Sequence, residues 1–171
     1  MQDQLNPARL SNFMFVIGGE RDDVVSYSCP AGVIAGIDLG VTIRGWQEHD
    51  IPMPSDKLSY DDIIIPFYLS DDLREWVYIV KWMFYCKQNS SVVEDEVVSK
   101  KFKDCTMFVL DGQQRITAKI IYHDCFPYNV DTINYTVNTA ENDNVTFNAG
   151  FKFTYMTVEL GNGEKFNEYS E

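Results

Sequence analysis

The stretch that decides the fold is Val145-Thr146-Phe147-Asn148-Ala149-Gly150-Phe151-Lys152-Phe153-Thr154-Tyr155. Its odd-numbered residues are apolar and most even-numbered residues are polar, so the pattern repeats every two residues. That period is typical of a β-strand with one buried face. We therefore predict a closing strand over residues 145–160, with its odd-numbered aromatic side chains in the core.

Shorter segments upstream also have strand-like patterns: Phe13–Ile17 is a short apolar run, and others, such as 115–122, alternate. Strands are predicted at Phe13–Ile17, at about 24–29, and at roughly 106–111, 115–122 and 132–138. Together with a long hairpin they give about eight strands, so the fold class is mostly β. The architecture is a β-sandwich or a flattened barrel, and alternation alone does not choose between them.

A single long helix is predicted over residues 70–88. Ser70 is a suitable N-cap, and the acidic residues that follow complement the positive end of the helix dipole. The apolar positions recur at helical spacing, which predicts that they pack on the sheet as a cap. They are Leu73, Trp76, Val77, Val80, Met83 and Phe84. The charged stretch 89–104 is expected to be an exposed loop with at most a short ordered piece.

A long, protruding hairpin is predicted between the first strands and the helix. Residues 37–44 alternate apolar with polar side chains, the tip spans 45–59, and the return strand runs from about 58 to 68. The tip contains Trp46, an aromatic residue that a solitary domain has little reason to expose. A hairpin of this kind leaves unpaired strand edges, which proteins normally protect from aggregation.

Composition indicates one folded domain spanning residues 1–171, with its core at about 12–160. The chain has 171 residues, of which 45% are hydrophobic and 14% aromatic. Its formal charge of −12 argues against binding to a phosphate backbone. The longest apolar runs are too short to cross a membrane, and the polar N-terminus lacks a secretory segment. The four cysteines are widely spaced, which predicts reduced thiols.

Candidate catalytic and metal sites are weak, so no enzymatic activity, metal or cofactor is predicted. His123, Asp124 and Cys125 are near neighbours on one predicted strand, whereas a catalytic Cys–His pair meets across a fold. Glu48, His49 and Asp50 are consecutive on a predicted loop, where three side chains seldom converge on one ion.

The order of these features resembles a known family. The segments that carry the resemblance are 13–16, 28–32, 58–67, Trp76 with 81–83, 125–127 as a turn, and 151–155. In this order and spacing the chain resembles the tail tube protein of T-even-like contractile phages, whose fold recurs in baseplate tube initiators. The resemblance covers residues 12–160.

The resemblance implies a structural virion protein made in the host cytoplasm. It implies hexameric rings that stack into the inner tube of a contractile tail, through which double-stranded DNA passes without specific binding. The implied partners are further copies of the chain and the sheath, baseplate and tape-measure proteins. A specialised ring at one end of the tail, with the same fold, is left open.

The residues themselves favour self-assembly by a separate route, because a neighbouring copy would cover the hairpin edge. The predicted subunit interface comprises Ile37, Leu39, Val41, Ile43, Arg44, Trp46, Asp61 and Asp62. An alternative from another class is a monomeric carbohydrate-binding module that uses Trp46 and Tyr60 as a stacking platform.

Overall fold

The computed structural model describes residues 13–18, 29–46, 49–91, 95–133 and 145–167. Of the strand expected at 24–29 only Cys29 lies within these ranges, and of that expected at 132–138 only Thr132 and Ile133 do; none of the three is in a strand. The rest of both expectations lies outside the described residues.

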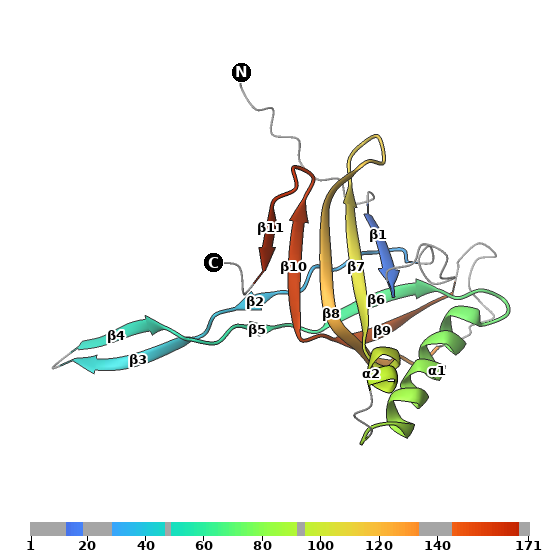
Figure 1. The fold of residues 1–171 in the computed structure, drawn as a ribbon, viewed down its shortest axis with the longest axis horizontal. Coiled ribbons are helices and arrows are strands. Elements are labelled where there is room, and N and C mark those ends of the chain that lie inside the picture. The colour runs from blue at the N-terminus through green and yellow to red at the C-terminus, as the bar shows by residue number, and fades with distance from the viewer. Residues whose placement is uncertain (1–12, 19–28, 47–48, 92–94, 134–144, 168–171) are drawn as a thin grey trace, which may run out of the picture.

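Five antiparallel strands form an upright sheet in the order β1-β7-β8-β10-β11 (Figure 1). Their bounds are β1 Phe13–Ile17, β7 Lys103–Leu110, β8 Ile116–Val130, β10 Tyr155–Leu160 and β11 Lys165–Asn167. Alternating apolar residues bury one face of this sheet, as in the first half of β8, where Ile120 and Tyr122 are buried and Ile121 between them is only partly buried.

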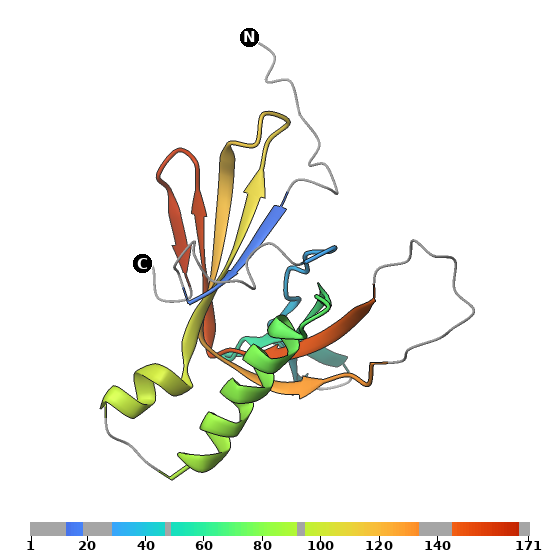
Figure 2. The same cartoon turned by 90° about the vertical axis from the view of Figure 1, so that its right-hand side faces the viewer.

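A second layer forms where β8 runs past the upright sheet. There β9 (Thr146–Lys152) pairs with the end of β8 on one side and with β6 (Ile63–Tyr68) on the other. Figure 2 shows this layer crossing below the upright strands. The expected mostly-β, sandwich-like domain with one long helix is confirmed, and a single strand shared by both layers joins them.

The bend that lets β8 serve both layers lies at Asp124. This residue has a left-handed backbone with φ of 56°, and the buried positions change from even to odd across it, from Tyr122 to Cys125. The turn expected at 125–127 is therefore wrong, because these residues continue β8. The change of direction comes one residue earlier.

The single closing strand predicted over 145–160 is also wrong. The chain leaves β9 at Lys152 and enters β10 at Tyr155, and the Thr154 N–H donates to the His123 carbonyl across 2.9 Å at the corner between them. β9 and β10 pair with different parts of β8. The alternation was read correctly, but it continues through the corner and so conceals the break.

The core between the layers is aromatic, as composition indicated. Phe151 lies at the centre, with ring centroids 6.2 Å from Phe15, 6.3 Å from Phe67 and 6.0 Å from Trp82. Phe15, Phe67 and Phe151 are all fully buried. Aromatic residues that meet edge to face or tilted give both buried area and a defined geometry.

The long helix, α1, spans Arg74–Gln88, and a short helix, α2, spans Asp95–Lys101. The predicted N-cap is wrong: α1 starts after Leu73, whose φ is 56°, and no side chain caps it. Ser70 acts from further away, because its N–H and hydroxyl donate to Glu75 at 3.1 and 2.6 Å. Glu75 therefore occupies part of the inward face of α1.

The apolar stripe expected to pack on the core lies largely on the outer side of α1. The helix buries Glu75, Ile79 and Trp82 instead, and Phe84 is 59% exposed. The Trp82 indole N–H donates to the Lys101 carbonyl across 2.8 Å, which joins the inward face of α1 to the end of α2. Both faces of α1 carry aromatic residues, so periodicity alone could not select the inner one.

The predicted hairpin is present and is divided into short ladders. β2 (Ile37–Asp38) pairs with β5 (Ser59–Tyr60), and β3 (Val41–Trp46) pairs with β4 (His49–Pro54). This division raises the number of strands above the expected eight. In the described part of the chain, neither helix is long and apolar enough to cross a membrane.

Candidate assembly interface

We call residues 37–60 the arm. It extends away from both sheet layers as a narrow two-stranded ribbon, and its β3–β4 end is the part furthest from the body (Figure 1). Gly40 adopts a φ of 66° between β2 and β3, a conformation that suits glycine. The Asp38 carboxylate accepts the Gly40 N–H across 2.9 Å and fixes this joint.

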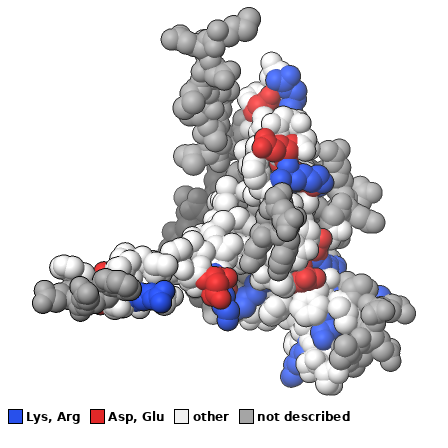
Figure 3. All heavy atoms as spheres, turned by 60° about the vertical axis from the view of Figure 1, so that its left-hand side comes forward, with Lys and Arg blue, Asp and Glu red and all other residues white. Residues whose placement is uncertain are grey.

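One face of the β3–β4 ribbon is apolar along most of its length. The register pairs Val41 with Pro54 and Ile43 with Pro52, and side chains of directly paired residues lie on the same face. Thr42, Arg44, Ile51 and Met53 form the other face. Figure 3 shows a projection that is mostly neither acidic nor basic over its described surface.

The predicted interface residues of the arm are exposed to solvent in the single chain. Val41 and Ile43 are 70% and 67% exposed, and Ile37 and Leu39 are about half exposed. Arg44 is also exposed. Burying a large aliphatic side chain stabilises a protein by about 1.5–3 kcal/mol, so four uncovered ones on one ribbon form a surface suited to a partner.

The predicted tip differs from the structure. Only residues 47 and 48 separate β3 from β4, so the return strand begins at His49 and not at about Leu58. Trp46 pairs with His49 at the end of the ladder. Sequence reasoning missed Ile51, Pro52, Met53 and Pro54 as ribbon residues, because prolines usually indicate a turn. Their alternation around Met53 was the available signal.

Asp61 and Asp62 lie where the arm joins the body. The Asp61 N–H donates to the Gly36 carbonyl across 3.0 Å, and a side chain at Gly36 would meet the Asp61 carboxylate. Asp62 forms an ion pair with Lys152 of β9 at 3.3 Å. The Tyr128 hydroxyl donates to Asp62, which raises the pKa of Tyr128. These contacts anchor the base of the arm to the second layer.

A buried tyrosine anchors the segment that leads into the arm. The Tyr122 hydroxyl accepts the Ala35 N–H and donates to the Val33 carbonyl, both at 3.4 Å. Burial raises the pKa of Tyr122 to about 12, so its hydroxyl remains a donor. Tyr60, the last residue of the arm, pairs with Ile37 at the base and packs on Phe153 with ring centroids 5.3 Å apart. This contact removes Tyr60 from the proposed carbohydrate platform.

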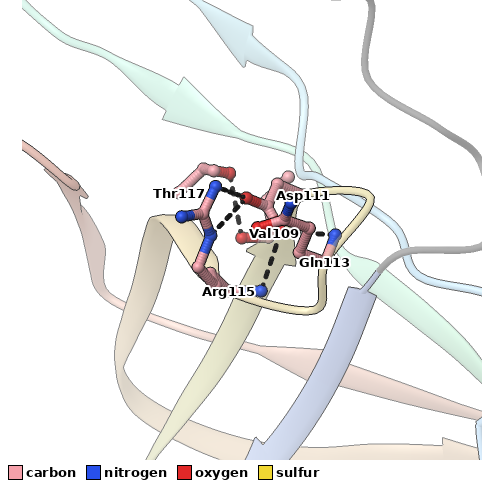
Figure 4. A network of polar contacts seen from close by, with 5 residues as sticks. All are labelled: Val109, Asp111, Gln113, Arg115 and Thr117. Atoms are coloured by element: carbon pink, nitrogen blue, oxygen red, sulfur yellow. Dashed lines mark hydrogen bonds and ion pairs between the residues drawn. The ribbon is translucent and has the colours of Figure 1, made fainter.

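A second projecting feature is the turn between β7 and β8, shown in Figure 4. The Asp111 carboxylate accepts the N–H groups of Gln113 and Arg115 at 2.8 and 2.9 Å, and the Arg115 guanidinium at 2.8 Å. The bond from the Arg115 N–H, followed by the other bonds to Arg115 and Gln113, lowers the pKa of Asp111. The Thr117 hydroxyl donates to the Val109 carbonyl across the ladder. This turn is a rigid, polar end, unlike the apolar arm.

An open groove of about 440 Å³ lies on the outer side of α1. Trp76, Val80, Met83 and Phe84 line it together with residues 129–133. It is therefore built from the stripe that periodicity assigned to the core. Nothing in the described residues indicates an occupant.

The candidate catalytic residues have structural contacts within the sheet. His123 Nδ1 lies 3.1 Å from Asp104 of β7, and Nε2 lies 3.0 Å from the Thr157 hydroxyl of β10. Both ring nitrogens are therefore occupied between strands. Cys125 is fully buried and donates to the Tyr122 carbonyl, away from any substrate in solution. His49 and Asp50 lie in β4, and no group of three potential metal ligands occurs among the described residues.

Solved structures share this fold. A chain of the sheath/tube terminator of the PVC extracellular contractile injection system superposes with a TM-score of 0.67 at 12% identity, covering 91% of this chain and 98% of that one. A chain of the PVC sheath–tube complex gives 0.64 at 12% identity, with 92% and 94% covered. Hcp1 from Salmonella typhimurium gives 0.51 at 12% identity, with 91% of each chain covered.

Two of these neighbours come from structures of an extracellular contractile injection system and the third is an Hcp1 protein, and the chain shares their fold. No protein-family model and no curated protein sequence matches the chain. At such low identity the likeness establishes the fold alone. What the arm does must be argued from its own surface.

Proposed function

We propose that this chain is a structural subunit that joins copies of itself into rings, which stack into the hollow tube of a contractile tail. The shared fold supports this role. The observation that carries the proposal is the arm, whose Val41 and Ile43 are 70% and 67% exposed. A two-stranded ribbon alone is marginally stable in water, so contact with another molecule would stabilise it.

We take the molecule that covers the arm to be a second copy of this chain. The arm lies on one side of the molecule, so a contact between the arm of one copy and the body of the next is heterologous. A heterologous contact that closes after a rotation gives a ring, and one that does not close gives a filament. A stacked tube combines both. The proposed contact residues are Ile37, Leu39, Val41, Ile43, Arg44, Trp46, Asp61 and Asp62.

The finer features of the proposal follow from the phage resemblance. They are six copies in each ring, a tube within a contractile phage tail, contacts with sheath, baseplate and tape-measure proteins, and passage of DNA during ejection. The charge of −12 supports passage without binding, provided that part of the acidity faces the lumen. A reconstruction of the polymer with a basic lumen would overturn the last point.

A terminal ring is a second candidate role. It is favoured because a sheath/tube terminator and a tube-terminating cap are among the structural neighbours, with TM-scores of 0.67 and 0.64. The two roles differ in outcome. A repeating subunit forms tubes of unlimited length, whereas a terminal subunit stops at a single ring or a short stack.

The test is to purify the wild-type chain and examine it by sedimentation velocity and negative-stain microscopy across a range of concentrations. Rings or tubes of uniform diameter are expected. Ile43→Asp places a charge on the apolar face of the arm and is expected to leave monomers. Ile116→Asp makes the same substitution at a 42% exposed isoleucine of β8, away from the arm, and is the matched control that still assembles.

A wild-type chain that remains monomeric at the highest concentration contradicts the proposal. So does equal assembly of Ile43→Asp and wild type. A glycan array provides the contrast with the recognition module: selective binding by a monomer whose arm is unassociated would support that alternative.

A further inference from the structure

The two edges of the β3–β4 ribbon differ in their backbone chemistry. In an antiparallel ladder, hydrogen-bonded pairs alternate with pairs whose N–H and C=O groups point outward. The Ser55 N–H donates to the Gly40 carbonyl across 3.3 Å, which makes this a hydrogen-bonded pair in the same register as β3–β4. Alternation then makes 42/53, 44/51 and 46/49 hydrogen-bonded and 41/54, 43/52 and 45/50 outward-facing.

The positions of the prolines agree with this assignment. Pro52 and Pro54 have no N–H and occupy outward-facing positions of β4, where their rings interrupt no bond to β3. The free edge of β4 consequently lacks two successive donors. A strand added to that edge would leave its own carbonyl groups unpaired, so β4 is blocked against pairing.

The free edge of β3 is intact. Its outward-facing residues are Val41, Ile43 and Gly45, each of which has both an N–H and a C=O. No proline occurs between residues 37 and 46. In the described part of the chain β3 pairs with β4 alone, so these groups receive no strand from their own molecule.

We propose that the open edge of β3 pairs with an edge strand of a second copy of this chain, and that the arm extends its sheet in this direction only. The inference rests on the proposed self-assembly and adds which edge is used. A strand added to this edge gains main-chain hydrogen bonds while the exposed Val41 and Ile43 side chains provide apolar contact.

The charge of the arm also fits a second copy. The Arg44 side chain is exposed and has no ion-pair partner among the described residues. The chain as a whole carries a formal charge of −12. An unpaired arginine beside a free edge is thus complementary to the acidic surface of another copy.

A second edge in the body is restricted in the same way as β4. Among the strands that the structure describes, β6 pairs with β9 alone. The Leu69 N–H donates to the Val145 carbonyl across 2.9 Å at the end of their ladder. The 69/145 pair is therefore hydrogen-bonded, and alternation along the ladder makes the 66/148 pair outward-facing. Pro66 thus lies at an outward-facing position of β6. Both strands on the return side of the chain therefore present a proline on their open edge. One-way pairing of this kind gives every subunit the same orientation in a ring.

The test removes one outward N–H from β3. Ile43→Pro deletes the N–H and most of the side chain, whereas Ile43→Ala deletes most of the side chain and keeps the N–H. The concentration at half-assembly, measured by sedimentation velocity, is expected to be at least about tenfold higher for Ile43→Pro than for Ile43→Ala. Pro52→Ala restores a donor to β4 and is expected to leave assembly unchanged.

Two further measurements keep the test decisive if proline distorts the ribbon. An ester in place of the Ile43 amide removes the N–H and keeps the side chain, and should reproduce the defect. Hydrogen exchange on the wild type should show the N–H groups of Val41, Ile43 and Gly45 protected in the assembly and unprotected in the monomer.

Equal assembly of the Ile43→Pro, Ile43→Ala and ester variants overturns edge pairing and leaves self-assembly standing. Exchange of the three amides at the same rate in monomer and assembly does the same. A wild-type chain that never assembles overturns the proposed function and this pairing together.

Discussion

β9 and β3 are both alternating apolar strands, yet they have opposite environments. In β9, Phe147, Ala149 and Phe151 are all at most 2% exposed, and both strand edges are paired. In β3, Val41 and Ile43 are 70% and 67% exposed, and one strand edge has no partner strand among the described residues. Alternation indicates that one face of a strand is apolar and becomes buried. The same chain buries this face in β9, and we propose that another copy buries it in β3.

This difference separates folding from assembly in the molecule. Substitutions in the body should change the free energy of unfolding of the subunit and affect assembly only as a consequence. Substitutions on the arm should change assembly and leave the free energy of unfolding nearly unchanged. The following predictions test that separation in order of decreasing effect on the free energy of unfolding.

Phe151→Ala should have the largest effect. Its ring contacts Phe15, Phe67 and Trp82 at the centre of the core, and its loss is expected to cost about 3–5 kcal/mol of unfolding free energy. Urea denaturation of the unassembled subunit measures this. Phe166→Ala, in β11 and 50% exposed, is the matched control, with an expected change below about 0.5 kcal/mol. Similar costs for both would refute the assignment of the core.

Glu75→Ala should have an intermediate effect. The buried carboxylate accepts two hydrogen bonds from Ser70 just before α1, and its removal leaves the half-buried Ser70 donors without this acceptor, at a cost of about 1–3 kcal/mol. Glu75→Gln retains one acceptor and should recover part of the loss. Asp72→Asn, which alters an exposed ion pair with Arg74, should change thermal stability very little. A tolerated Glu75→Ala would show that Ser70 has other partners.

Glu159 should have a small effect that depends on pH. Hydrogen bonds from Lys165 and then Lys119 lower its pKa below the ordinary value of 4.5. The folded state therefore binds protons less readily, so the stabilisation is complete above pH 4.5 and disappears as pH falls through the folded-state pKa.

Glu159→Gln should accordingly lower the unfolding free energy by about 0.5 kcal/mol near neutral pH, because the bridge is partly exposed. The difference from wild type should shrink at pH values below 4.5. Urea midpoints across this range provide the measurement. A difference that grew on acidification would have the wrong sign and would contradict this assignment.

Val41→Ala should have the smallest effect on the subunit. The side chain is 70% exposed, so truncation should change the unfolding free energy by less than about 0.5 kcal/mol. The same variant should raise the concentration at half-assembly, because the side chain is buried only between copies under the proposed function. A Val41→Ala variant that is less stable to unfolding yet assembles normally would contradict the assignment of Val41 to assembly.

Local patterns determined much of this protein in advance. Period-two alternation located β9 and the first half of β8, because a pleated strand points successive side chains to opposite faces whatever surrounds it. A short apolar run located β1. The mostly-β class, the long helix and the protruding hairpin followed from the same kind of local signal. Ile37, Leu39, Val41 and Ile43 are predicted from the same alternation to be subunit contacts. The structure exposes all four in the single chain, and their burial against another copy stays a prediction.

Other features depended on distant contacts that no local period encodes. The inward face of α1 was decided by where Ile79 and Trp82 meet the sheet, because both sides of the helix are apolar enough to be buried. The corner at Asp124, the division of β9 from β10 and the return strand at Pro52 and Pro54 all required pairing partners to be known. The sequence determines which apolar residues are stabilised by burial, while the tertiary structure decides which surface is close enough to bury them.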